Sequence, residues 1–438
     1  MRRTPVTSLN VVSREIFRSL GIRNFRLFFV GQSISQVGNW LTLIAQTLLV
    51  LKLTNSGIAL GLLAAAQFGP VLIFGAFAGL VADRSDKRKL LLVVQSFAMV
   101  QSFALAALAF QAHPPMWAIY LVASFGGLAT AFDNPAPRSY VVEIVPTSHI
   151  PNAVSLNTAS MTGSRIIGPA LGGLLVATAG FGWAFVVDGL SYIAVLTSLF
   201  MIDARQVRPA PMTPRGRGQV RAGLAYTWRI TELRVPIIML AVIGTLAFNF
   251  QTVLPLFAVR DLGGAAITFS LLMSVTSIGS FTGALYSAHR THISIDSVAL
   301  AAAGFGAAML ALALAPNQPI AFAMGAVMGF ASISFMTAST AIVQLRADPM
   351  MRGRILALQA LVFLGSTPIG GPILGFISQR YGSRYGLAVG GLAGLGAALY
   401  GVLAVRKARR GDQRHEARSP RGGHDLTAPG LAPQPVNS

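Results

Sequence analysis

A short, strongly charged segment near the start of this chain lies between two long stretches that contain no charged residue. The stretches cover residues 58–82 and 90–112, and each can cross a bilayer as one helix, which needs about 20 residues. Four of the six residues at 84–89 are Lys or Arg, an excess that marks a loop as cytoplasmic. The sequence therefore predicts two membrane-spanning helices joined by a tight cytoplasmic turn. Gly79, near the end of the first helix, would let the backbones approach closely.

The composition of the whole chain is that of a protein that lies mostly in a membrane. Only 11% of the 438 residues are charged, against about 25% in an ordinary soluble domain, and the mean hydropathy is +0.63. The chain has no cysteine, which excludes disulfides and thiolate metal sites. No cleavable signal peptide is expected, because the apolar run that follows the basic N-terminus is too long for one.

Twelve apolar stretches predict an all-α integral membrane protein with twelve transmembrane helices. With both termini placed inside, 29 of the 34 Lys and Arg residues fall on inner segments and four on outer loops, which orients the chain. The net charge of +20 is thereby explained without a nucleic-acid partner. We expect a multi-pass protein of a bacterial plasma membrane with cytoplasmic termini. The predicted helices cover residues 27–51, 58–82, 90–112, 116–132, 153–179, 181–202, 235–259, 265–286, 297–315, 320–343, 355–377 and 385–405.

The two halves of the chain repeat one pattern of glycines. A shift of 202 residues places five glycines of the first half on glycines of the second, and Trp183 on Tyr385. Parallel repeats of this kind build many transporters. The glycine pairs are Gly127 with Gly329, Gly163 with Gly365, Gly168 with Gly370, Gly173 with Gly375, and Gly180 with Gly382.

The repeat and the charge pattern together predict five parts of the chain. A basic cytoplasmic N-terminus (1–26) precedes a first six-helix bundle (27–202). A cytoplasmic linker (203–234), with a short surface helix around 222–228, leads to a second bundle (235–405). The tail (406–438) is basic and rich in Gly and Pro, and is predicted to be disordered.

The charged turn also resembles the signature loop between helices 2 and 3 of the major facilitator superfamily, written G-x-L-x-D-R-x-G-R-R. Gly79, Asp83, Arg84 and Arg88 match it, Lys87 is a like-charged replacement, and Val81 and Asp86 depart from it. The resemblance implies twelve helices in two six-helix bundles that rock around a central site. It also implies that contacts of this loop at the inner face hold an outward-open state.

Four amide side chains in the first predicted span fall within an arc of about 80° on one helical face. Amides are costly against lipid, so this face should meet a wet cavity or neighbouring helices. The resemblance implies a substrate-lining role, and hydrogen bonding between helices is the alternative. The related seventh span carries two more amides. The six residues are Gln32, Gln36, Asn39, Gln46, Asn249 and Gln251.

Arg165 is the one cation inside a predicted span, and Asp188 in the next span is its expected partner. Ionised groups in membranes are usually paired or functional. One interpretation is that Asp188 binds and releases a proton while Arg165 pairs alternately with Asp188 and an anionic substrate. The other is a permanent structural ion pair.

Two further segments resemble parts of exporters. Gly168, Pro169, Gly172 and Gly173 resemble the core of the fifth-helix motif of proton-coupled drug exporters, although Ser155 and Ser164 replace its upstream glycines. The segment from Asp133 to Arg138 resembles the enterobactin-exporter and secretion-effector branch. The resemblance implies that Asp133 and Arg138 help to close the cytoplasmic face. The fourth-helix Arg of drug exporters is absent from this sequence.

The chain is not expected to be an enzyme. Its six His residues lie in loops and the tail without metal-ligand spacing, and it has no Walker motif. No cofactor is expected, and a proton gradient is the expected energy source. We predict a monomeric antiporter in the bilayer that exports a small amphipathic molecule, such as a drug, siderophore or secondary metabolite. An importer of the same fold, a scaffold or sensor that transports nothing, and a protein that moves lipids are the alternatives.

Overall fold

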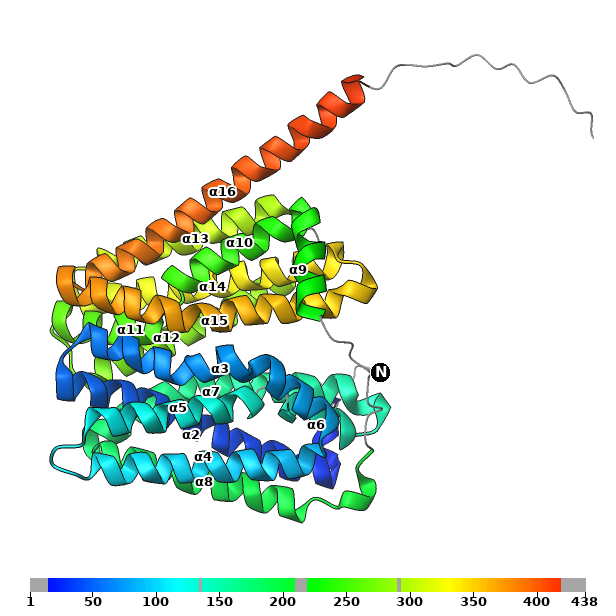
Figure 1. The fold of residues 1–438 in the computed structure, drawn as a ribbon. Coiled ribbons are helices and arrows are strands. Elements are labelled where there is room, and N and C mark those ends of the chain that lie inside the picture. The colour runs from blue at the N-terminus through cyan, green and yellow to red at the C-terminus, as the bar shows by residue number, and fades with distance from the viewer. Residues whose placement is uncertain (1–14, 134–135, 209–218, 290–292, 419–438) are drawn as a thin grey trace, which may run out of the picture.

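The computed structural model describes residues 15–133, 136–208, 219–289 and 293–418, and all regular structure within these ranges is helical. The helices lie side by side in two bundles, with the first half of the chain below the second in Figure 1. The first bundle contains α2 (Arg23–Thr54), α3 (Gly57–Arg84), α4 (Lys87–Ala109), α5 (Met116–Asp133), α6 (Ala136–Glu143), α7 (Ile150–Thr178) and α8 (Phe181–Met201).

The second bundle has the same organisation. Its helices are α10 (Thr231–Leu246), α11 (Phe250–Leu256), the π-helical turn η4 (Phe257–Asp261), α12 (Ala266–Ala288), α13 (Ile295–Ala313), α14 (Gln318–Arg346), α15 (Pro349–Tyr381) and α16 (Ser383–Arg418). Short elements complete the described chain: η1 (Arg18–Gly21), η2 (Thr147–His149), η3 (Ala204–Gln206) and α9 (Gln219–Arg229). The α9 helix confirms the surface helix that was predicted in the linker.

Eleven helical stretches of the described chain are long and apolar enough to cross a membrane. The exact count of twelve is therefore not confirmed. The predicted span 153–179 forms α7, which is 29 residues long but is not among the eleven. The part of α7 up to Arg165 is polar and includes Ser155 and Asn157. The α7 helix packs against α2 in its own bundle and α12 in the other.

The seventh predicted span is not one continuous helix. It is interrupted between α10 and α11, where Asn249 has backbone angles outside the helical region. The Asn249 amide donates to the carbonyl of Thr245 over 2.8 Å, and a side chain bonded to a nearby backbone group competes with the helix. Pro255 in the following turn also has no N–H to offer to the residue four positions before it.

The repeat predicted from the glycine pattern is confirmed by the geometry of the paired glycines. Gly180 and Gly382, each before the last helix of its bundle, both have positive φ angles of 92° and 111°, a conformation that other residues rarely adopt. Gly127 meets the α3 backbone as Gly329 meets the α12 backbone, at distances too short for any side chain. At these two pairs of positions, the two bundles therefore use glycine in the same way.

The bundles contact each other along two helix pairs, α3 with α15 and α7 with α12. At the first pair, Gly57 and Gly61 meet the backbone of Gly375 and Gly371, so a side chain at Gly57, Gly61 or Gly375 would collide with backbone atoms. At the second pair, Gly173 contacts Ser270 of α12. Close packing at the Gly-rich segment of the fifth span is thus confirmed, because small residues let helices approach in a membrane.

The contact between the bundles is concentrated at one end. We call the end with α9 and the α3–α4 turn the basic end, and the opposite end the far end (Figure 1). At the far end, the Arg260 guanidinium donates to the Asn55 carbonyl, and the Gly57 N–H donates to Gln379 over 2.8 Å. No hydrogen bond or ion pair of the described residues joins the bundles at the basic end. The structure is therefore closed at the far end.

Two sequence predictions about this basic end need correction. A side chain at Gly79 would meet no atom within 4 Å, so this glycine makes no close approach in this conformation. The tail was predicted to be disordered from 406, but α16 continues to Arg418. Residues 406–418 are mostly Arg, Lys, Ala, Gln and Glu, which favour helix, and a Ser-Pro pair follows at 419–420. Residues 419–438 lie outside the described chain.

Candidate functional site

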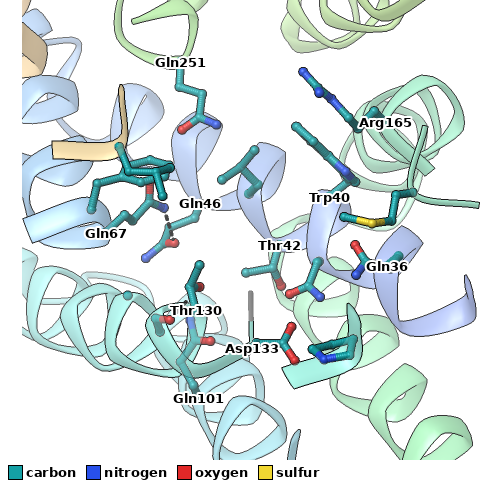
Figure 2. A pocket seen from close by; sticks show the side chains of 18 of the residues that line it. Gln36, Trp40, Thr42, Gln46, Gln67, Gln101, Thr130, Asp133, Arg165 and Gln251 are labelled. Atoms are coloured by element: carbon teal, nitrogen blue, oxygen red, sulfur yellow. Dashed lines mark hydrogen bonds between the residues drawn. The ribbon is translucent and has the colours of Figure 1, made fainter. Parts of the chain in front are cut away.

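A cavity of about 430 Å³ lies inside the molecule, lined almost entirely by the first bundle. Its walls come from α2, α3, α4, α5, α6 and α7, and the second bundle adds Gln251 of α11 and Leu364 of α15. Figure 2 shows amide side chains converging from several helices on the same space. The lining includes Asp133 and Arg138 near the basic end, so the cavity extends toward the end at which the described residues of the two bundles make no polar contact with each other.

The amide face predicted on the first span forms one wall of this cavity. Gln32, Gln36, Asn39 and Gln46 of α2 all line it. Two of them also bond to neighbours: the Gln67 amide donates to Gln46 over 2.8 Å, and the Tyr192 hydroxyl donates to Asn39 over 2.8 Å. The two interpretations of this face are thus not exclusive, and substrate contact stays a prediction.

Several amide atoms at the cavity are buried and have no hydrogen-bond partner among the described residues. They are both side-chain polar atoms of Gln32, the nitrogen of Gln46 and the oxygen of Gln251. A buried polar group without a partner costs free energy, about 1–3 kcal/mol. Such groups are expected where water or a ligand supplies the missing bond.

Asp188 is completely buried beside the cavity, where α8 packs on α2. Its carboxylate accepts hydrogen bonds from Thr42 (2.6 Å), Ser102 (2.5 Å) and Ser191 (3.4 Å). The Asp188 carboxylate is in contact with Gly38, where a side chain would collide with it. Thr42 also lines the cavity, so one hydroxyl lies between the cavity and this carboxylate.

The ion pair predicted between Arg165 and Asp188 is not formed. Among the described ion pairs none involves either residue. Arg165 is accessible in the cavity, and its guanidinium lies over the Trp40 ring at 5.9 Å. Asp188 instead points to hydroxyls on three helices. Hydroxyl groups satisfy a carboxylate without a counter-charge, and hydropathy alone does not reveal which of them face inward.

Asp133 and Arg138 both line the cavity, near the basic end of the molecule. The Asp133 carboxylate accepts from the Gln95 amide over 2.7 Å, and the Gln95 oxygen accepts from Ser35 over 3.5 Å. Neither residue contacts the second bundle through a described hydrogen bond or ion pair. The closed inner face predicted for them is absent from this conformation, and their role in the opposite state stays a prediction.

The second bundle contributes one of its two predicted residues. Gln251 lines the cavity and points toward Gln46 and Gln67 in Figure 2. Asn249 is buried and bonds to the end of α10, so it shapes the interruption of the helix and does not line the cavity. The adjacent Phe248 packs against Phe305 and Phe363, at 5.0 and 5.1 Å between ring centres.

The charged turn organises the basic end of the first bundle. Asp86, which departs from the family pattern, caps α4 by accepting from the Lys89 N–H over 3.1 Å. Arg88 donates to the last carbonyls of α8, Leu199 at 2.9 Å and Phe200 at 3.1 Å. Lys87 forms an ion pair with Glu143 of 2.7 Å that is almost fully buried. Arg84 is exposed, and the Asp83 side chain lies outside the description.

Sequence reasoning missed several cavity residues. Trp40, Thr42, Gln67 and Gln101 all line it. Gln67 and Gln101 are isolated amides in otherwise apolar spans, which is itself a signal of an inward-facing residue. Thr42 carries no such signal, because threonine is common in membrane helices and often bonds its own backbone. No group of His, Asp, Glu or Cys in the described chain has a metal-binding arrangement.

Comparison with known proteins places this geometry among transporters. A family model described as "Transmembrane secretion effector" matches residues 16–425. Macrolide efflux protein A of Streptococcus pyogenes is 20% identical over 377 residues, which cover 84% of this chain and 92% of that protein. The enterobactin exporter EntS of Salmonella typhi is 23% identical over 385 residues, covering 87% and 91%.

A further relative and two solved structures extend the comparison. The uncharacterized MFS-type transporter YfiS of Bacillus subtilis is 25% identical over 227 residues, a match that spans 51% of this chain and about half, 53%, of that relative. A bacterial homologue of the human lysosomal transporter Spinster has a TM-score of 0.70 at 15% identity, covering 89% of this chain and 97% of its own. The nucleoside transporter NupG has a TM-score of 0.68 at 15% identity, covering 88% and 99%. At such identities the likeness is one of fold.

Proposed function

Because this chain belongs to the transmembrane secretion effector family of major facilitator transporters, we propose that it is a proton-coupled exporter. It exchanges protons for a small polar or amphipathic molecule by alternating access, with the central cavity as the substrate site. In this proposal α7 supplies the twelfth span, both termini lie in the cytoplasm, and the protein resides in the plasma membrane. The relatives named for export of macrolides and enterobactin support this direction of transport.

The observation that carries the proposal is the environment of Asp188. An ionised carboxylate inside a membrane protein is expensive unless it is paired, and Asp188 has three hydroxyl partners and no described cation. A hydroxyl can donate to an ionised carboxylate or accept from a protonated one. The same three partners can therefore serve both protonation states, which a coupling group requires.

The path to Asp188 supports its role as well. Thr42 bonds to Asp188 on one side and lines the cavity on the other, so substrate and proton act on adjacent positions of α2. With the far end closed and the cavity reaching the basic end, this conformation is the inward-open state of the proposed cycle. A proton carried inward would be released from Asp188 through Thr42 into this cavity, and substrate would enter by the same route.

The test uses inside-out membrane vesicles energised to an acidic interior. Candidate siderophores, macrolides and other metabolites are added, and dissipation of the proton gradient is recorded for wild type and for Asp188→Asn. The control is Glu232→Gln, which neutralises an exposed carboxylate paired with Arg346 at the surface, where an ion pair contributes little.

Dissipation by some compounds that is lost in Asp188→Asn and kept in Glu232→Gln is the expected result. Equal dissipation in Asp188→Asn would contradict the coupling role of Asp188. No dissipation by any compound, with inserted protein demonstrated, would contradict proton-coupled export. In that case, accumulation of outside solute by whole cells would indicate an importer, and the lack of any flux a scaffold or sensor.

A further inference from the structure

The charges that line the cavity do not cancel. Its charged lining residues are Arg165, Arg138 and Asp133, so the formal net charge is positive. Asp133 already accepts a hydrogen bond from Gln95. Arg165, in contrast, has no carboxylate partner within 4 Å among the described residues. A cation that remains accessible and unpaired inside a membrane protein is expected to meet an anion during function.

The Arg165 guanidinium is also held in place. It lies 5.9 Å from the centre of the Trp40 ring, within the range of a cation–π interaction, and Figure 2 shows the two side chains lying alongside each other. Trp40 itself is fixed because its Cβ contacts Gly168 of α7, where no larger residue fits. A planar guanidinium that is supported on one face keeps its N–H groups free for two parallel bonds to a carboxylate.

The remaining lining residues favour hydrogen bonding over apolar contact. Gln32, Gln46 and Gln251 hold the unpartnered amide atoms described above, and aromatic lining is restricted to Trp40 and Phe68 among the described residues. Lipophilic cations are usually held by aromatic faces and free carboxylates, and this cavity offers few of either. A volume of about 430 Å³ falls in the range of sites for drug-sized ligands.

We infer that the cavity binds an organic anion: a carboxylate that pairs with Arg165 on its Trp40 support, and that carries amide or hydroxyl groups for Gln32, Gln46 and Gln251. This inference rests on the proposed function, because it names the class of substrate for that same cavity. Trp40 acts as a positioning residue for Arg165. A lipophilic cation is the substrate class that this arrangement disfavours.

The test measures binding to the full chain purified in detergent, by the shift of its melting temperature and by calorimetric titration. The probes are N-acyl amino acids in matched sets of three, such as hippurate, its neutral amide hippuramide, and benzamidoethylammonium. Members of a set share the ring and the amide and differ in charge. Binding by carboxylate members and not by their neutral or cationic partners is the expected result.

Variants then assign the binding to Arg165. Arg165→Gln should weaken carboxylate binding about 10- to 100-fold, as expected for a lost charge-assisted bond. Arg165→Lys should restore only part of it, because an ammonium cannot make the paired bonds. Trp40→Leu should weaken binding without changing the preference for charge. Arg205→Gln, an exposed arginine outside the cavity, is the control and should bind as wild type.

Binding of no carboxylate in any set would overturn the inference, and so would equal binding by Arg165→Gln or a preference for the ammonium members. Binding in detergent requires no proton gradient. A protein that binds the carboxylates but fails the vesicle test would keep this inference and lose the proposed function. If only cationic compounds dissipated the gradient in the vesicle test, the proposed function would stand and this inference would be overturned.

Discussion

Thr42 donates a hydrogen bond of 2.6 Å to the buried carboxylate of Asp188 and also lines the central cavity. One side chain thus contacts both the Asp188 carboxylate and the cavity that is the proposed substrate site. Proton transfer needs a continuous series of hydrogen-bonding groups, and Thr42 is the only residue of the described cavity lining that bonds to Asp188. In the proposed cycle, the Thr42 hydroxyl is therefore the step between the substrate site and the proton-binding carboxylate.

Two replacements of Thr42 distinguish the effect of its hydroxyl on transport from the effect of its side-chain shape. Thr42→Val keeps the shape and loses the hydroxyl, so proton-driven transport should slow about tenfold, the scale of a lost bond to a charged group. Thr42→Ser keeps the hydroxyl and should stay near the wild-type rate. Transport in vesicles at a fixed pH gradient measures both, and equal rates for the Val and Ser variants would contradict the step through Thr42.

Glycines at the two ends of α3 should have opposite effects on the conformation. A side chain at Gly61 collides with the Gly371 backbone at the closed far end, whereas one at Gly79 meets open space. Overpacking costs about 1–3 kcal/mol, so Gly61→Leu should disfavour the closed far end and shift the protein toward an outward-open state. Gly79→Leu should not disfavour the conformation described here.

The absence of cysteine from the chain makes this shift measurable. A single cysteine at Thr130, which is exposed in the cavity, is labelled with an impermeant maleimide in inside-out vesicles. Labelling should be slower in Gly61→Leu than in the parent protein, and no slower in Gly79→Leu. Faster labelling in Gly61→Leu would contradict the assignment of the open end.

Breaking the ion pair between Lys87 and Glu143 should destabilise the basic end of the first bundle. Both side chains are almost fully buried, and removal of one member of such a pair leaves an uncompensated charge that costs about 3–5 kcal/mol. Glu143→Gln should therefore lower the melting temperature in detergent. The double variant Lys87→Met/Glu143→Gln removes that charge and should recover part of the loss; a double variant less stable than Glu143→Gln would contradict this explanation.

The family and the repeat were predictable because they depend on residues whose role is local. The charged turn is recognised from its basic residues and from the short distance between two apolar spans. The family that it indicated is confirmed by the match over residues 16–425. Gly180 and Gly382 mark equivalent turns because no other residue takes their positive φ easily. The amides of α2 were predictable as one face since helical geometry fixes which residues lie together.

The contacts of the cavity were less predictable, because they depend on how helices rotate against each other. Arg165 and Asp188 are suitably spaced in the sequence to pair, but each contacts a residue of α2 instead. Arg165 lies over the Trp40 ring, and Asp188 accepts a hydrogen bond from Thr42. The interruption at Asn249 likewise depends on one side chain bonding to the Thr245 carbonyl, together with Pro255 in the next turn. Neither the partners of these two charged residues nor the interruption of the helix can be predicted from hydropathy or residue spacing.

The most direct test of the account is the effect of Asp188→Asn on two modes of transport by purified protein in liposomes. The compound identified in the vesicle screen is followed as uptake driven by a pH gradient and as exchange between equal concentrations without a gradient. We predict that Asp188→Asn loses gradient-driven uptake by at least about tenfold, the scale of a lost bond to a charged group, and retains exchange, since binding and alternation remain. Equal gradient-driven uptake by wild type and Asp188→Asn would contradict the central claim that Asp188 carries the coupled proton.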